Sequence, residues 1–181
     1  MAREDQIQTV VAPSPRGQLL LVATEIGLCG VEFLPAETLT PETLTPESDV
    51  LAPGVSVAPI LKTAVAQIDE YFSGSREVFD LPLDLRGTPF QKEVWRALLG
   101  IPFGARTSYG AIAAEIGRPT AVRAVGGAIG RNPLLFVVPC HRVVAKNGAL
   151  TGFSAGMGHK QWLLSHEEAL LSTPSLGITE A

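Results

Sequence analysis

The segment 88–129 constrains the fold most, because it carries explicit start and stop signals for three short helices in succession. Thr88 is a helix N-cap, Pro89 suits the first helical position, and Gln91 completes a capping box with the threonine. We expect this first helix to run to about Leu99, where a Gly-Ile-Pro sequence ends it.

Two further helices are expected at short spacing. Ser108 is placed to cap a helix that a Gly-Arg-Pro sequence ends, and Thr120 is placed to cap another over residues 121–129. Short helices joined by a tight turn are typical of a helix-turn-helix unit, although such pairs also occur in cores that bind no nucleic acid. The last helix contains Gly126 and Gly127, which each cost about 1 kcal/mol relative to alanine. We therefore expect another surface, a core helix or a nucleic-acid backbone, to approach closely there.

The first 87 residues have a different pattern. Three apolar runs separated by turn residues predict an antiparallel meander, a helical apolar period predicts an amphipathic helix, and an alternating run predicts a half-buried strand. These elements are expected at 9–12, 19–23, 28–34, 60–72 and 79–85. The pentapeptide Glu-Thr-Leu-Thr-Pro occurs twice in a proline-rich segment, which we interpret as a surface loop or linker.

These elements predict an α/β chain of the α+β type. A small N-terminal antiparallel sheet-plus-helix domain is expected over residues 1–87, with a loop insertion at 36–58. A mainly helical, winged-helix-like domain is expected over 88–170, followed by a flexible tail at 171–181. A length of 181 residues accommodates two such small domains.

Charge is distributed unevenly between the two halves. Residues 1–87 have five Lys/Arg and thirteen Asp/Glu, whereas residues 88–181 have nine and five. Between Arg96 and Lys146 lie seven basic residues and a single acid, Glu115. This concentration is expected of a surface that contacts phosphates, although a solvated basic face has the same composition.

No targeting or membrane segment is apparent. The N-terminal residues lack an apolar block with a cleavage site, and the apolar run 134–138 is far shorter than the about 20 residues that cross a bilayer. We therefore expect a cytoplasmic protein without a membrane partner. Cys29 and Cys140 are expected to be free thiols there, with Cys29 a small apolar core residue.

Cys140 has the surroundings of a nucleophile. We expect a buried strand at 134–138 to deliver it, with His141 and Arg142 directly after it. The thiolate is the reactive form of cysteine, and a nearby His or Arg lowers the thiol pKa from about 8.5. Adjacent residues of a strand point to opposite faces, so His141 could reach the thiol only if the chain bends or a water bridges them.

A cysteine hydrolase is one alternative for this site. The histidine of such an enzyme comes from elsewhere in the sequence. His159 and His166 lie on a late helix, and no Asn or Asp follows in a convincing orienting position.

Several motifs in order give the second half a family resemblance. The chain resembles the O6-alkylguanine-DNA alkyltransferase family from about Thr88 to Glu168, on the motifs RAVGGA (123–128), NP (132–133), PCHRV (139–143), GFS (152–154) and WLLSHE (162–167). The resemblance implies a single-turnover DNA-repair protein, a methylated-DNA–protein-cysteine methyltransferase that moves an alkyl group from O6-alkylguanine onto its own cysteine. Whether O4-alkylthymine is a second substrate is left open.

The resemblance also implies catalytic roles. Cys140 would accept the alkyl group, activated through a water by His141, with Glu167 holding the imidazole. Tyr109 would donate a proton or hydrogen bond to the departing guanine. Asn132 would hold the local turn and shape the pocket.

A second implied set binds substrate and DNA: Arg123, Ala124, Gly126, Gly127, Arg142 and Ser154. Arg123 would fill the gap left when the damaged nucleotide rotates out of the duplex. The small residues of the same helix would let it lie against the minor groove, and Ser154 would hydrogen-bond the O6 side of the base. Ala155, directly after this serine, stands where many members have glycine, so the resemblance does not determine the width of the pocket.

The implied partner is double-stranded DNA, bound by a monomer that could cooperate along the duplex. No cofactor is expected. No metal is expected either, because residues 1–87 contain Cys29 and no histidine, whereas some family members bind zinc there.

Two rival functions share parts of this pattern. A non-catalytic alkyltransferase-like protein would bind the lesion without chemistry, but such proteins lack the acceptor cysteine. A helix-turn-helix transcriptional regulator would explain the arginines but not the PCHRV motif.

Overall fold

The computed structural model describes residues 7–35 and 58–172. The duplicated pentapeptide, nearly all of the predicted insertion at 36–58 and most of the predicted tail at 171–181 lie outside the described residues.

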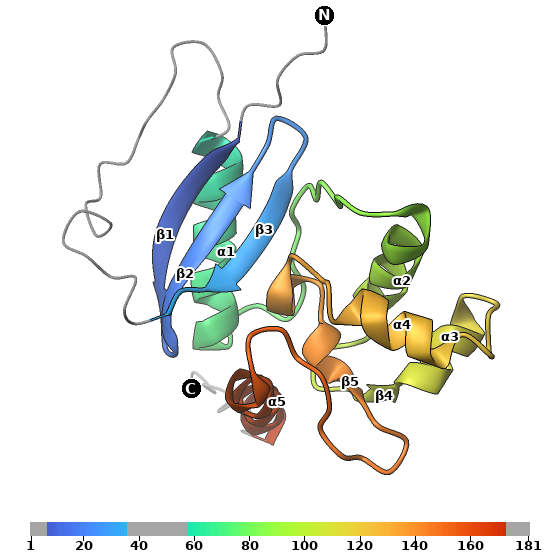
Figure 1. Cartoon of the computed structure of the whole chain (residues 1–181). Coiled ribbons are helices and arrows are strands. Elements are labelled where there is room, and N and C mark those ends of the chain that lie inside the picture. The colour runs from blue at the N-terminus through green and yellow to red at the C-terminus, as the bar shows by residue number, and fades with distance from the viewer. Residues whose placement is uncertain (1–6, 36–57, 173–181) are drawn as a thin grey trace, which may run out of the picture.

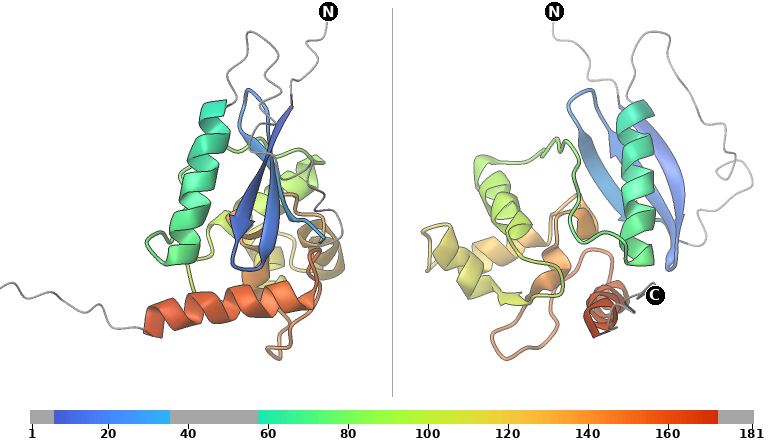
Figure 2. Two further views of the ribbon diagram at one scale, coloured as in Figure 1. Left: turned by 90° about the vertical axis from the view of Figure 1, so that its left-hand side faces the viewer. Right: turned by 180° about the vertical axis from the view of Figure 1, so that it is seen from behind.

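The N-terminal part is a three-stranded antiparallel sheet backed by one helix. Strands β1 (Gln8–Ser14), β2 (Gly17–Ala23) and β3 (Leu28–Phe33) pair in the order β1-β2-β3. Helix α1 (Ala58–Ser73) lies across one face of this sheet (Figure 1 and Figure 2). The central strand turns its fully buried residues Leu19, Leu21 and Ala23 toward the core. The predicted meander and helix are thus confirmed.

The prediction of a strand at 79–85 is wrong. Only Leu83 forms a bridge, with Leu28 of β3, while Leu28 donates from its backbone to Pro82 and accepts from Asp84. Pro82 has no N–H to give to a ladder, so the alternating apolar pattern here produces an extended connection and not a full strand.

The helical segment follows its sequence signals closely. Helix α2 (Pro89–Leu99) has Thr88 as N-cap with both hydrogen bonds of the capping box, and Ser108 caps α3 (Tyr109–Glu115) through Ala111 N. Helix α4 (Val122–Ile129) starts one residue later than expected. The position before it is Ala121 with no side-chain cap, so the prediction that Thr120 caps this helix is wrong.

The apolar run at 134–138 is not a strand. It forms the short 3-10 helix η2 (Leu135–Val137), followed by a second one, η3 (Cys140–Arg142), and by strand β5 (Val143–Val144). All five residues of the run are buried. A run buried on every side has no periodicity that separates a strand from a helix, which explains the error.

The last helix joins the two parts of the chain. Helix α5 (Met157–Ser172) runs beneath the end of α1, as Figure 1 and the left view of Figure 2 show. Strand β5 pairs in parallel with β4 (Thr107–Ser108), next to α3. A single core cluster contains residues of the sheet, of α1 and of the helices after residue 88.

The architecture is the expected α+β fold, a small antiparallel sheet followed by helices. No helix within the described ranges is long and apolar enough to cross a membrane.

Candidate active site around Cys140

Cys140 is the first residue of η3 and lies almost completely inside the protein. Its relative exposure is 2%, and its backbone N donates to Val138 O at 2.7 Å. The preceding residue, Pro139, is the N-cap of this 3-10 helix. The chain therefore does bend at this point, although no hydrogen bond joins Sγ to the neighbouring imidazole. Any molecule that reacts with Sγ must reach into the protein to do so.

Asn132 ties the thiol to the backbone turn that carries it. Its Nδ2 donates to Cys140 Sγ at 3.1 Å, to Val138 O at 2.8 Å and to Leu135 O at 3.3 Å. Its Oδ1 accepts from Leu134 N at 3.1 Å. Because one amide spans both short helices, it fixes the position of Sγ and favours the thiolate by hydrogen bonding.

His141 and Glu167 form a buried pair beside this thiol. His141 Nε2 lies 2.8 Å from Glu167 Oε1, and both side chains are fully buried. The glutamate is ionised, so it can only accept, and Nε2 must carry the proton of a neutral imidazole. The other ring nitrogen, Nδ1, is therefore an acceptor. It is buried and has no hydrogen-bond partner among the described residues.

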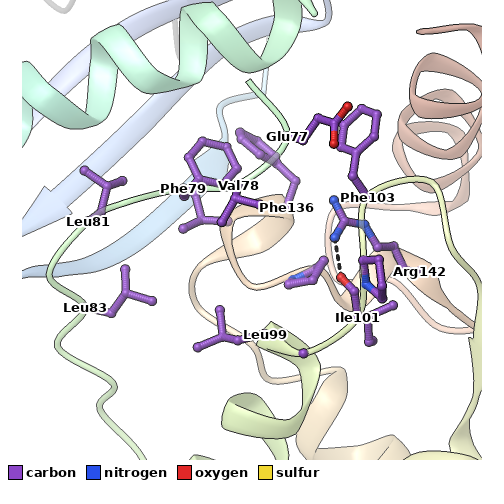
Figure 3. A pocket seen from close by; sticks show the side chains of 14 residues that line it. Glu77, Val78, Phe79, Leu81, Leu83, Leu99, Ile101, Phe103, Phe136 and Arg142 are labelled. Carbon is purple, nitrogen blue, oxygen red and sulfur yellow. Dashed lines mark hydrogen bonds between the residues drawn. The ribbon is translucent and has the colours of Figure 1, made fainter. Parts of the chain in front are cut away.

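Arg142 binds the same carboxylate. Its Nε and Nη2 donate to Glu167 at 2.8 to 3.2 Å, and Nη1 donates to Ile101 O at 2.7 Å, the dashed bond in Figure 3. Its guanidinium also lies 5.6 Å from the Phe103 ring centroid. The side chain is buried and committed to these groups. This contradicts the expectation that Arg142 binds DNA, because a buried, paired guanidinium does not reach a phosphate.

The pKa values of the site follow from burial and these contacts. Burial raises the pKa of the Cys140 thiol to about 11, against opposing effects of Asn132 and of the Lys160 charge. The net shift is therefore opposite to the lowering expected from His141 and Arg142: the His141 backbone does oppose burial, but its imidazole and the Arg142 guanidinium are not among the groups that lower the thiol pKa. Burial also lowers the pKa of His141, despite the opposing glutamate. Although burial alone raises the pKa of Glu167, hydrogen bonds from the two basic neighbours hold it at about 2.

At neutral pH the site therefore contains a thiol, a neutral imidazole and a carboxylate. A neutral imidazole can accept the thiol proton, and the carboxylate stabilises the imidazolium that results. The arrangement provides a base for a buried nucleophile.

A lysine and a tyrosine meet on the loop beyond η3. Lys160 Nζ donates to Val143 O at 2.6 Å and to Thr151 O at 2.7 Å, and the lysine is fully buried. Tyr109 OH donates to the same Thr151 carbonyl at 2.9 Å. Tyr109 thus begins α3 as predicted and lies against the loop that contains Ser154. Ser154 itself is exposed.

The face of α4 carries the other predicted residues. Arg123 and Ala124 are exposed at its start, and Gly126 and Gly127 are partly exposed one turn later. A Cβ atom at 126 would lie 3.6 Å from the Tyr109 ring, and one at 127 would lie 3.3 Å from the Arg131 side chain. Neither glycine meets another helix backbone. Internal packing of a core helix thus does not explain the pair.

The basic residues between 96 and 146 do not all form one free surface. Besides the buried Arg142, Arg106 pairs with Glu168 at 3.0 Å and Arg118 pairs with Glu93 at 3.1 Å. Both pairs are exposed. The exposed arginine at the start of α4 has no hydrogen bond or ion pair within the described structure. Arg96 and Lys146 are exposed as well, so all three basic side chains are accessible to a partner.

A pocket lies behind the site. Segments 77–83, 99–103 and 136–142 line it with mostly apolar side chains, and Figure 3 shows Arg142 at one end. Cys140, Tyr109 and Ser154 are not among its lining residues, so it does not lead a substrate to Sγ. No group of three or more His, Cys, Asp or Glu side chains that could hold a metal ion occurs in residues 7–35 and 58–172.

Two buried polar residues of the site were not predicted from the sequence. Lys160 shares one face of α5 with Leu163, Leu164 and Glu167, and this spacing could have indicated it. Tyr71, at the end of α1, donates to Glu167 Oε1 at 2.8 Å. Only the tertiary structure brings it to the site.

Comparison with known proteins covers both parts of the chain. Residues 9–85 match the 6-O-methylguanine DNA methyltransferase ribonuclease-like domain, and residues 89–169 match the 6-O-methylguanine DNA methyltransferase DNA binding domain. A Methanosarcina barkeri protein named methylated-DNA–protein-cysteine methyltransferase is 40% identical over 158 residues, which is 87% of this chain and 95% of that protein.

Solved structures show the same similarity. The crystal structure of Mycobacterium tuberculosis O6-methylguanine methyltransferase superposes with a TM-score of 0.75 at 39% identity, over 94% of this chain and 96% of that one. Mycobacterium tuberculosis OGT in complex with DNA superposes with a TM-score of 0.73 at 40% identity, over 91% and 93% of the two chains.

Proposed function

The chain belongs to the 6-O-methylguanine DNA methyltransferase family, and from that membership we propose that Cys140 is the cysteine that takes up the alkyl group. The chain is a DNA-binding repair protein that transfers an alkyl group from O6-alkylguanine in DNA to its own cysteine. The resemblance drawn from the sequence is confirmed. The buried His141–Glu167 pair beside the Cys140 thiol is the observation that carries the assignment of the site.

The first step is removal of the thiol proton. A thiol with a pKa of about 11 is protonated at neutral pH and needs a base. Nδ1 of neutral His141 is the available acceptor, reached through one water. Glu167 then stabilises the imidazolium through Nε2, as the carboxylate of a catalytic triad does.

The second step is alkyl transfer. The thiolate attacks the alkyl carbon, the new S–C bond forms as the C–O6 bond breaks, and the bonding electron pair passes to guanine. The Tyr109 hydroxyl exchanges its hydrogen bond to Thr151 O for one to the departing base, and the proton lost by the thiol is the one that neutral guanine finally requires. The thioether is stable, so each chain acts once.

The base must leave the duplex for this reaction. Cys140 is 2% exposed, and a base stacked in a helix cannot approach its sulfur. Arg123, exposed at the start of α4, fills the vacated stack. Ala124, Gly126 and Gly127 lie against the minor groove, where small residues let a helix approach closely.

Other parts of the proposal concern the pocket and the whole protein. Asn132 shapes the pocket by holding the turn, and Ser154, exposed on the adjoining loop, bonds the O6 side of the base. The protein acts as a monomer on DNA in the cytoplasm, with residues 1–87 as scaffold and 88–170 as catalytic and DNA-binding domain.

The rival function is lesion binding without chemistry, and Cys140 argues against it. A duplex with a labelled O6-methyl group distinguishes the two. After transfer the label stays on the protein when the protein is denatured, and its amount equals the amount of active chains. After lesion binding without chemistry the label stays on the DNA. Cys140→Ser is expected to abolish labelling.

A further inference from the structure

Tyr71 connects the N-terminal part of the chain to the catalytic carboxylate. It lies near the end of α1, is fully buried, and donates from its hydroxyl to Glu167 Oε1 at 2.8 Å. The same oxygen accepts from His141 Nε2 at 2.8 Å. A residue 96 positions away in the sequence thus shares the acceptor atom that stabilises the imidazole.

Aromatic packing fixes the position of this hydroxyl. The Tyr71 ring is stacked on Phe136 with centroids 5.4 Å apart and an interplanar angle of 9°. The Phe72 and Phe103 rings pack against it in T-shaped geometry, with centroids 5.2 and 6.0 Å away. Phe136 belongs to η2, which leads directly to Cys140. The tyrosine therefore contacts both the turn that carries the nucleophile and the partner of the base.

We propose that Tyr71 is a positioning residue for alkyl transfer, which fixes the Glu167 carboxylate and limits how strongly Oε1 binds protonated His141. The inference rests on the proposed function, in which His141 takes the thiol proton. In this proposal the N-terminal part of the chain contributes to the chemistry in addition to its role as a scaffold.

The charges around this carboxylate determine the direction of the effect. The Glu167 carboxylate accepts from His141 and Arg142 of η3, from the Tyr71 hydroxyl of α1 and from Gly104 N, the last at 3.0 Å. The Lys160 charge, from α5, lowers the pKa of His141. A hydrogen bond to a carboxylate disperses its charge and weakens its attraction for a neighbouring cation. Loss of the hydroxyl leaves more of that charge for the imidazolium. His141 should then keep its proton to higher pH, where it cannot act as base.

The tyrosine hydroxyl stays protonated throughout. Burial and the adjacent glutamate raise the pKa of Tyr71 well above its ordinary value, so it donates over the whole range in which transfer is measured. A pH effect of its replacement therefore reports on the His141–Glu167 pair and not on titration of the tyrosine.

The test is the pH dependence of single-turnover transfer from a duplex with O6-methylguanine. For Tyr71→Phe we expect the acidic limb of the rate profile to shift to higher pH by about half a pH unit to one pH unit. Below the midpoint this is roughly a three- to tenfold loss of transfer rate. The rate on the alkaline plateau should change much less. The control is Phe72→Leu, which removes aromatic packing next to Tyr71 but no hydrogen bond to Glu167.

A second variant keeps the test decisive if Tyr71→Phe folds poorly. Site-specific 3-fluorotyrosine at position 71 keeps the ring and makes the hydroxyl a stronger donor, so the acidic limb should move to lower pH. Thermal unfolding of each variant separates lost stability from a changed profile.

An unchanged limb in both Tyr71 variants, or equal shifts in Tyr71→Phe and Phe72→Leu, would overturn the inference. Failure of the native chain to transfer, or undiminished transfer by Cys140→Ser, would instead contradict the proposed function.

Discussion

Asn132 Nδ2 donates a hydrogen bond of 3.1 Å to Cys140 Sγ. The amide also binds the carbonyls on either side of the turn, so it is both a partner of the thiol and a part of the backbone that carries it. The same buried side chain thus holds the sulfur in place and, with the Lys160 charge, opposes the effect of burial on its pKa.

Replacement of Asn132 should affect transfer and stability together. Asn132→Ala leaves the backbone groups of the turn without their partner, which typically costs about 1 to 3 kcal/mol of unfolding free energy for each buried group. It also removes the hydrogen bond that favours the thiolate, so transfer should slow even where the chain is folded. Asn147→Ala, which removes an exposed amide that only accepts from Ala149 N, is the matched control. Native transfer and melting in Asn132→Ala would contradict this role.

The buried glutamate and histidine should make the protein sensitive to acid. The pKa of Glu167 is held at about 2 in the fold against 4.5 in the unfolded chain, and the pKa of His141 is lowered from 6.5. Below these unfolded-state values the unfolded chain binds more protons, so stability falls as pH falls. The loss should begin near 6.5 through the histidine. It should continue between 4.5 and 2 through the glutamate, by about 3 kcal/mol.

Chemical denaturation at a series of pH values measures this effect. Glu167→Gln should be less stable than the native chain at neutral pH by about 3 to 5 kcal/mol, because Arg142 is left buried without its partner. Between 4.5 and 2 it should lose less stability than the native chain, because the Glu167 contribution is missing. The exposed neighbour provides the control, since Glu168→Gln should keep the native profile. A native chain whose stability does not change between neutral pH and about 3 contradicts the account.

Arg123 should matter for duplex DNA and not for the free base. Only a duplex has a stack to fill when its base rotates out, so Arg123→Ala should slow repair of duplex while reaction with free O6-alkylguanine stays nearly native. Arg118→Ala removes the same charge from an exposed residue paired with Glu93 and serves as control. Equal loss on both substrates in Arg123→Ala would indicate a packing role.

Ala155 should limit the size of the adduct. It is half-buried and packs against the core, next to the exposed Ser154. We expect the chain to prefer methyl over benzyl adducts, and Ala155→Gly to gain selectively on the benzyl substrate, because a clash in a tight site costs about 1 to 3 kcal/mol, which is tenfold or more in rate. Ala149→Gly adds the same flexibility on an exposed turn and should not change selectivity. Equal gains on both substrates would rule out a steric limit at this position.

Local signals predicted the helices well and the buried segments poorly. The cap at Thr88 and the cap at Ser108 are side-chain contacts within three residues, so the sequence contains both partners. The run at 134–138 is surrounded by core on all sides and has no polar face to reveal its period. Pro82 interrupts a pattern that is otherwise typical of a strand.

The sequence around Cys140 indicated the nucleophile, whereas the catalytic roles of its partners came from the family resemblance. His141 and Glu167 were assigned in that way, and the structure brings them into contact. Burial of Arg142 and the raised pKa of the thiol depend on tertiary packing, which no local pattern reports. The contact of Tyr71 with Glu167 joins residues from the two ends of the fold and was not accessible from the sequence.

The most direct test of the central claim is the intact mass of the chain after mixing with a duplex that contains one O6-methylguanine, followed by peptide mapping. The chain has two cysteines, so Cys29→Ser is a matched control for Cys140→Ser. We predict one methyl group per native chain, on the peptide with Cys140, the same gain in Cys29→Ser, and none in Cys140→Ser although it still binds the duplex. A native chain that gains no mass, or a methyl group that persists in Cys140→Ser, would contradict the account.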